Sequence, residues 1–208
     1  MHITVLGATG TTGQQVVERT LRSGHRLTAL LRDPARLPQR DDDRVSLVVG
    51  DATDAEDLKN AMTGSRAVIA TLGAGLDLRS DLASRAARAV LPAAEAAGVA
   101  RVVWLSSLGA GSTLQHVALL PKLGIKLAMR GLFADKALAD ELIRSSRLDW
   151  TIVYPLTLTN GPRTGKCTAV HTPRRRIGSG VSRADAAEFM LGLAETGQWS
   201  RRAAILSR

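Results

Sequence analysis

The chain has 208 residues, 45% hydrophobic and 23% charged, so we expect one domain, residues 1–208, that buries roughly 70% of its unfolded surface without disulfide bonds. Its single cysteine, Cys167, excludes an internal disulfide and a multi-cysteine zinc site, and its four histidines lack metal-ligand spacing, so we predict no metal. The formal net charge of +9 would suit a nucleic-acid partner, but aromatic residues are only 3% of the chain, base-stacking platforms are scarce, and we expect no such partner.

Apolar runs typical of strands alternate with helical patterns along the chain. The strands are predicted at residues 2–6, 26–31, 45–49, 66–71, 100–105 and 149–154, and the helices at residues 12–23, 54–62, 80–97 and 132–146. Beyond residue 154, the pattern predicts a strand at 166–171, a helix at 182–195 and a short strand at 203–207. Strands that alternate with helices indicate a parallel sheet with crossover helices on both faces. The predicted fold class is therefore α/β, a doubly wound parallel sheet.

Several residues mark the ends of the predicted helices. Gly24 and Gly98 follow helical patterns and suit their C-terminal stops. Asp33 precedes a proline, which is typical of an N-cap followed by proline at the first helical position, and Asp54 suits a second N-cap. Ser182 is the expected cap of the last helix.

The N-terminal end of the chain bears on its location. Met1 directly precedes the first predicted strand, which leaves no room for a signal peptide. No stretch of the sequence approaches ~18 uninterrupted apolar residues. We therefore expect a cytoplasmic protein without a membrane span.

Three glycines, Gly7, Gly10 and Gly13, follow the first predicted strand and open the first predicted helix. Glycine lets the backbone turn tightly and approach a ligand closely, and the N-terminus of the next helix favours a phosphate. A glycine trio alone also fits a plain turn. Its position between a strand and a helix favours a loop that holds a dinucleotide pyrophosphate.

Arg32 follows the second predicted strand, where an enzyme that uses NAD usually has an acidic residue for the ribose 2′-hydroxyl. A guanidinium instead matches the geometry of a 2′-phosphate, and Arg36 lies one helical turn further on. The alternative is that Arg32 is solvated and Asp33 binds the ribose. Because Asp33 is already the expected cap, we predict NADP(H) as the coenzyme.

The residues after the other strands lie where a parallel sheet binds its ligand. Asp51 is placed to meet the adenine, although it also suits a plain turn before the helix. Gly73 lets backbone approach the coenzyme. Ser107 would lie near the nicotinamide, although serines also end strands for capping reasons.

The motifs Gly-Ala-Thr-Gly-x-x-Gly, Leu-Arg-Asp-Pro-x-Arg, Gly-Asp-Ala, Leu-Ser-Ser and Leu-Asp-Trp-Thr-Ile-Val-x-Pro occur in that order and span nearly the whole chain. Together they resemble the atypical short-chain dehydrogenases/reductases, and within them the NmrA-like and biliverdin reductase B or flavin reductase-like group. The resemblance implies a Rossmann fold, NADP and a small substrate pocket over the nicotinamide, from about residues 108–132 and 155–182. The residues that it implies for the coenzyme are Gly7, Thr9, Gly10, Thr11, Thr12, Gly13, Arg32, Arg36, Asp51, Ala52, Leu72, Gly73, Ser106 and Pro155.

The chain departs from this family in its acid–base pair. Dehydrogenases of the family that act on alcohols use Tyr-x-x-x-Lys, whereas here the single tyrosine is Tyr154 and residue 158 is leucine. Phe133 and Lys136 stand about where the pair would fall, so the tyrosine acid is missing. Hydride transfer to a flavin or quinone needs less from the protein, because the conjugated ring spreads the incoming charge and takes its proton from water.

The predicted catalytic residues are therefore Ser107 and Lys136, whose ammonium would stabilise developing negative charge; a lysine on a helix can also simply be solvated. Gly109, Tyr154 and Thr157 are predicted to line the substrate pocket. Residues 114–133 are apolar with interspersed cations, which would suit a membrane surface but in this fold favours a substrate lid or a subunit contact, with Gly124 and Gly131 as hinges.

Two functions follow from the sequence. The first is an NADPH-dependent oxidoreductase that transfers a hydride to a flavin, quinone or similar conjugated small molecule. The second is a non-catalytic NADP(H)-binding redox sensor of the NmrA-like type. Either would be a monomer or a homodimer.

Overall fold

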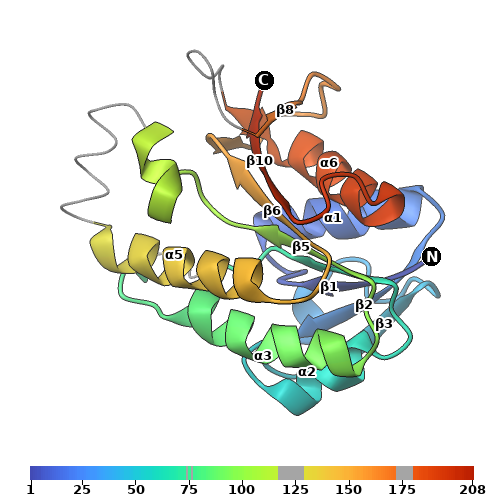
Figure 1. The fold of residues 1–208 in the computed structure, drawn as a ribbon. Coiled ribbons are helices and arrows are strands. Elements are labelled where there is room, and N and C mark those ends of the chain that lie inside the picture. The colour runs from blue at the N-terminus through green and yellow to red at the C-terminus, as the bar shows by residue number, and fades with distance from the viewer. Residues whose placement is uncertain (74, 76, 117–128, 172–179) are drawn as a thin grey trace.

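The computed structural model describes residues 1–73, 75, 77–116, 129–171 and 180–208 (Figure 1). The strands are β1 (His2–Leu6), β2 (Arg26–Leu31), β3 (Val45–Val49), β4 (Ala67–Ala70), β5 (Arg101–Leu105), β6 (Trp150–Pro155), β7 (Leu158–Thr159), β8 (Thr168–Val170), β9 (Val181–Ser182) and β10 (Arg202–Ser207). The α-helices are α1 (Thr11–Arg22), α2 (Ala55–Met62), α3 (Leu82–Ala96), α5 (Arg130–Ser145) and α6 (Arg183–Thr196). Two short 3₁₀ helices, η1 (Pro34–Arg36) and η2 (Gly111–His116), lie between them.

Within the described residues, eight strands form one sheet in the order β3-β2-β1-β4-β5-β6-β10-β8. Neighbouring strands run parallel, except that β8 is antiparallel to β10. The chain winds outward from β1 in one direction through β2 and β3, and then in the other through β4. The sheet order therefore reverses at β1, and a sheet of this type binds its ligand beyond the carboxyl ends of the strands at that point. The predicted Rossmann-type α/β fold is confirmed.

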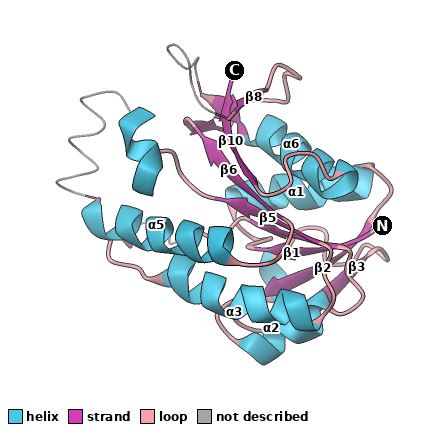
Figure 2. Ribbon diagram, viewed as in Figure 1, coloured by secondary structure: helices cyan, strands magenta, loops and turns pink. Residues whose placement is uncertain are grey.

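Helices cover both faces of the sheet, as Figure 2 shows. Helices α2, α3 and α5 pack on one face and α1 and α6 on the other, and each face has its own cluster of buried apolar side chains. Ile3 and Val5 of β1 point to one face and Leu6 to the other, all fully buried. Burial of an aliphatic side chain of this size contributes roughly 1.5–3 kcal/mol, which is why the strands of a covered parallel sheet are apolar throughout.

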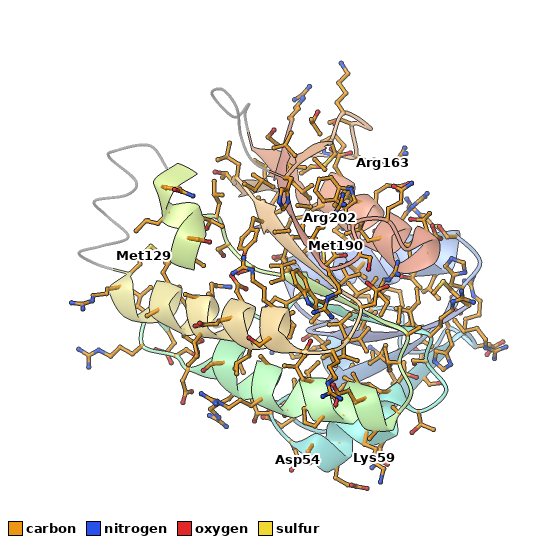
Figure 3. All side chains as sticks on the ribbon, in the orientation of Figure 1. Asp54, Lys59, Met129, Arg163, Met190 and Arg202 are labelled. Atoms are coloured by element: carbon orange, nitrogen blue, oxygen red, sulfur yellow. The ribbon has the colours of Figure 1, made fainter. Side chains whose placement is uncertain are left out.

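The helix ends follow the sequence closely. Gly24 and Gly98 have φ values of +75° and +66° after α1 and α3, the left-handed conformation in which glycine ends helices. Asp54, labelled in Figure 3, accepts hydrogen bonds from the amides of Glu56 and Asp57 and caps α2. Asp33 caps only the single turn of η1, because its side chain accepts from the amide of Ala35 at 3.0 Å and the chain then turns away.

Every strand and helix predicted from the sequence is present, with ends shifted by a residue or two. The pattern did not predict η2 or the two-residue parallel pairing of β7 with β9. Most of segment 114–133, including Gly124, lies outside the described residues. Gly131 lies in the first turn of α5, where an added Cβ would come within 3.2 Å of the Leu78 carbonyl oxygen. That position is therefore a close helix contact and not a loop hinge.

No helix in the described part of the chain is long and apolar enough to cross a membrane.

Candidate functional site

The glycine loop leaves β1 in a conformation that only glycine adopts easily. Gly7 has φ +79°, and a Cβ built there would lie 2.8 Å from the carbonyl oxygen of Thr71 on the neighbouring strand end. At Gly13 a Cβ would lie 2.0 Å from the Gly7 carbonyl oxygen. The amide of Gly10 donates to that same oxygen at 3.0 Å and closes the turn. The loop is therefore folded back on itself too tightly for side chains at Gly7 and Gly13.

The loop ends at the N-terminus of α1, which has no neutralising group of its own. Gly10 is its N-cap, no side chain in the described part of the chain caps it, and its first turn holds no acidic residue. By contrast, Asp54 caps α2, and the carboxylate of Asp135 accepts from the first amides of α3. The first-turn amides and the positive dipole end of α1 are thus left for an anion. This uncapped helix start, with its glycine cradle, fits the pyrophosphate of a dinucleotide. The predicted Thr9, Thr11 and Thr12 lie in the same loop and turn.

Arg32 follows β2, and both Arg32 and Arg36 are exposed. The pKa of Asp51 is lowered, mainly by hydrogen bonds from the hydroxyl and amide of Thr53 and further by the charges of Arg32 and Arg85. The Thr53 amide and hydroxyl each donate to Oδ1 of Asp51 at 2.8 Å, so this side chain forms a turn, as the alternative interpretation held. Its role at an adenine stays a prediction.

The remaining predicted coenzyme residues lie at the carboxyl ends of β3, β4, β5 and β6. Ala52 and Leu72 are half-buried against the core beneath the edge. Among the described residues, nothing lies within 4 Å of a Cβ built at Gly73. Ser106 directly follows β5, Pro155 is the last residue of β6, and both are buried.

Ser106 leads into a buried polar cluster that the sequence did not reveal. Its hydroxyl donates to Oδ2 of Asp140 on α5 at 3.0 Å, and the hydroxyl of Tyr154 donates to the same oxygen at 2.7 Å. Arg144, one turn further along α5, donates from Nη2 to the Tyr154 hydroxyl at 2.6 Å. Asp140 is 1% exposed, and its other oxygen, Oδ1, is buried with no hydrogen-bond partner in the described chain.

The electrostatics of this cluster follow from burial. Burial raises the pKa of Asp140 to about 6, against hydrogen bonds from Tyr154 and Ser106 that favour its ionised form. The pKa of Lys136, one turn earlier on α5, is lowered by burial, which the charges of Asp140 and Asp135 only partly offset. Burial and the neighbouring Asp140 raise the pKa of Tyr154, so its hydroxyl stays protonated. A tyrosine held in this way does not lose its proton as the acid of an alcohol dehydrogenase does.

The structure brings some predicted residues together and separates others. Lys136 is electrostatically coupled to Asp140, and Asp140 links Ser106 to Tyr154, so α5 joins the ends of β5 and β6. Ser107 follows Ser106 and is half-exposed.

The predicted pocket residues are not all on one wall. Gly109 is buried with φ +110° and donates its amide to the Thr113 hydroxyl at 2.8 Å. The exposed Thr157 instead accepts from the amide of Val181 at 2.8 Å and starts the β7–β9 pairing. Tyr154 is fully buried on the α3/α5 face of the sheet.

Asp140 was missed because a carboxylate on a helix usually faces water. The signal that could have found it is the spacing of residues 136, 140 and 144, which places Lys136, Asp140 and Arg144 on one face of α5.

The fold and the glycine cradle together define a nucleotide-binding protein. The NAD(P)H-binding family model matches residues 7–196, and the chain belongs to that family. The expectation of a nicotinamide coenzyme is thereby confirmed.

Three comparisons show where in the family the similarity lies. The structure is similar to that of ChuY, an anaerobillin reductase from Escherichia coli O157:H7, with 26% identity, 99% of this chain and 96% of that chain covered, and a TM-score of 0.82. In sequence it is 29% identical to the photosystem II assembly factor Ycf39 of Cyanophora paradoxa over 73% of this chain and 44% of that protein. It is 34% identical to a 3-diazoavenalumate denitrifying reductase from Streptomyces sp. over 50% of this chain and 36% of that protein.

The chain spans about half the length of the curated relatives it matches. The family and the structural similarity together give an NAD(P)H-binding protein with a reductase-like fold.

Proposed function

We propose that this protein is an NADPH-dependent oxidoreductase that transfers a hydride to a flavin, a quinone or a similar conjugated small molecule. The observation that carries the proposal is the polar cluster on α5, in which the buried Asp140 is hydrogen-bonded to Ser106 at the end of β5 and Lys136 lies half-buried one turn away. Burial raises the pKa of Asp140 and lowers that of Lys136, and ionisable groups perturbed in this way at the ligand-binding end of a sheet are typical of functional sites.

The choice of NADPH rests on Arg32 and Arg36. Both are exposed beyond β2, and the described residues include no ion pair to either of them. A guanidinium that is not engaged by a carboxylate is available for the bidentate contact that a 2′-phosphate offers. Asp33, the acidic alternative for the ribose, is already engaged as the cap of η1.

The bound coenzyme supplies the hydride, and the residues of this chain provide the binding and the electrostatics. The glycine loop and the start of α1 would hold the pyrophosphate, with the nicotinamide toward the end of β5. Ser107, which is half-exposed after Ser106, would orient the nicotinamide. Lys136 places a positive charge where negative charge develops on a conjugated acceptor, and its burial strengthens that interaction. No residue has to deliver a proton, because a conjugated acceptor takes one from water.

The named relatives support a reductase. ChuY and the Streptomyces protein are both described as reductases, and they act on chemically different molecules. Similarity to both favours reduction of a small molecule without selecting the acceptor.

A non-catalytic NADP(H) sensor is the second candidate. It is favoured by the absence of a Tyr-x-x-x-Lys pair on α5 and by the similarity to Ycf39, which is described as an assembly factor. In that case the site would bind the coenzyme and change a contact with a partner.

Turnover distinguishes the two candidates. NADPH oxidation, followed by the loss of nicotinamide absorbance, is measured with FMN, riboflavin and several quinones. We expect turnover with at least one acceptor, and we expect Ser107→Ala to lower turnover more than it lowers NADPH affinity. Tight NADPH binding without turnover on any acceptor would favour the sensor.

Coenzyme preference is tested by titration. Arg32→Ala is expected to weaken NADPH binding roughly 10–100-fold with little effect on NADH, as the loss of one charge-assisted contact implies. Arg88→Ala, an exposed substitution on α3, is the matched control. Equal affinities of the parent protein for NADH and NADPH would exclude the 2′-phosphate role of Arg32.

A further inference from the structure

A cavity lies away from the glycine loop, on the face of the sheet that carries α5. Its volume is about 380 Å³. It extends along β6 and β10 beneath η2, beside the C-terminal half of α5. Its lining residues are Ser112, Thr113, Gln115, Arg144, Trp150, Tyr154, His171, Arg201, Arg202, Ala203 and Ile205. None of the predicted coenzyme-binding residues is among them.

The cavity is positively charged. Three of its lining residues are arginines, Arg144, Arg201 and Arg202, and none is an aspartate or a glutamate. Across the described ranges of the chain, no salt bridge involves any of these three guanidinium groups. Arg144 donates to the neutral hydroxyl of Tyr154, and Arg201 donates to the carbonyl oxygen of Leu148 at 3.1 Å. The charges of Arg201 and Arg202 are therefore not balanced by a paired carboxylate within the described chain, whereas Arg144 acts electrostatically on Asp140.

The wall of the cavity also holds an unused hydrogen-bond donor. Trp150 is only 6% exposed, and within the described structure its indole Nε1 is buried without a hydrogen-bond partner. An unpaired buried donor costs roughly 1–3 kcal/mol, and a native protein keeps such a group where something accepts from it. The edge of Trp150 and the half-buried Ala203 give this wall an apolar surface, and Tyr154 and Ile205 lie buried behind it.

We propose that this cavity binds an organic carboxylate with a flat apolar body. The apolar body would lie against Trp150 and Ala203, and the carboxylate would be held by the exposed guanidinium groups of Arg201 and Arg202. A carboxylate matches the fork of a guanidinium, and a ligand with both parts explains why arginines and aromatic side chains line the same space. The proposal concerns a site separate from the coenzyme loop, and it does not depend on catalysis.

The probe is 2-naphthoate, with the uncharged 2-naphthalenemethanol as the matched ligand, and binding is measured by titration calorimetry with and without saturating NADP⁺. We expect naphthoate to bind at least roughly tenfold more tightly than the alcohol, and NADP⁺ to leave its affinity unchanged. Arg202→Gln, which alters an exposed side chain with no ion pair among the described residues, should weaken naphthoate binding roughly tenfold. Trp150→Phe keeps an aromatic ring, removes the indole N–H and should also weaken binding.

The control substitution is Arg88→Gln on α3, which removes the same charge from a distant surface and should leave naphthoate binding unchanged. Equal affinity for the acid and the alcohol would mean an apolar cavity without anion recognition and would overturn the proposal. So would an equal effect of Arg202→Gln and Arg88→Gln, displacement of naphthoate by NADP⁺, or no measurable binding. Circular dichroism of each variant verifies folding, and if Trp150→Phe does not fold, Arg202→Gln decides the question.

Discussion

Because Asp140 is a buried carboxylate, we expect it to make the free energy of unfolding depend on pH. Its pKa of about 6, against 3.8 for a free aspartate, arises mainly from burial. The folded state therefore holds this proton more tightly than the unfolded state. The group costs no stability below about pH 3.8, and its full cost is present above about pH 6. That difference corresponds to about 3 kcal/mol.

The perturbation is Asp140→Asn, which keeps the shape of the side chain and removes its charge. Unfolding free energies are measured by urea denaturation at about pH 4.5 and about pH 7.5 for the parent and the variant. We expect the parent to lose about 2 kcal/mol relative to the variant between these two pH values, because part of the cost is already present at the lower one. Acids with lowered pKa values, such as Asp42 and Asp185, are present in the parent and in the variant, so their contributions to the pH dependence cancel in the comparison.

The control is Asp41→Asn, which removes the same charge from a side chain that is 85% exposed. The neighbours that face Asp140 are Lys136 and Arg144 on α5, Tyr154 on β6 and Ser106 on β5, and they are unchanged in both proteins. A difference between parent and Asp140→Asn that is the same at both pH values, or that grows toward low pH, would refute the reasoning.

Two further predictions concern the glycine loop and the last helix. Gly13→Ala places a Cβ 2.0 Å from the Gly7 carbonyl oxygen, so it should lower NADPH affinity at least roughly tenfold in a fluorescence titration and lower the melting temperature. Gly192→Ala in α6 is the control, because a Cβ there meets nothing within 4 Å among the described residues. It should leave NADPH affinity unchanged and stabilise the protein by about 0.5–1 kcal/mol. Equal effects of the two substitutions on NADPH affinity would contradict the role of the glycine loop. Asp185→Asn should cost about 2–3 kcal/mol at neutral pH, because the carboxylate accepts hydrogen bonds from Thr164 and Gly165 as well as from the α6 cap. Burial alone would raise the pKa of Asp185, but these hydrogen bonds outweigh burial and lower that pKa. The stability that the carboxylate provides is therefore present above about pH 3.8 and disappears on acidification. A variant as stable as the parent in urea at neutral pH would exclude this role.

The sequence alone determined the alternation of strands and helices, most helix ends and the coenzyme loop. These features depend on residues close together in the chain. Gly7, Gly10 and Gly13 form one turn, Asp54 caps the helix that follows it, and apolar runs identify strands buried on both faces. The family resemblance was readable for the same reason, since its motifs are short and lie at the strand ends.

Only the tertiary structure decided where the polar cluster and the cavity beside β6 and β10 lie. Ser106, Asp140 and Tyr154 come from β5, α5 and β6, and they meet because α5 packs on the sheet with one face turned inward. Tyr154 was predicted as a pocket wall, and it is also the hydrogen-bond donor that holds Asp140. Helical periodicity gives the spacing of side chains along a helix, but the direction in which that helix is rotated on the sheet depends on long-range packing. That rotation places the Asp140 carboxylate in the core and Arg144 at the cavity, where Arg201 and Arg202 arrive from the start of β10.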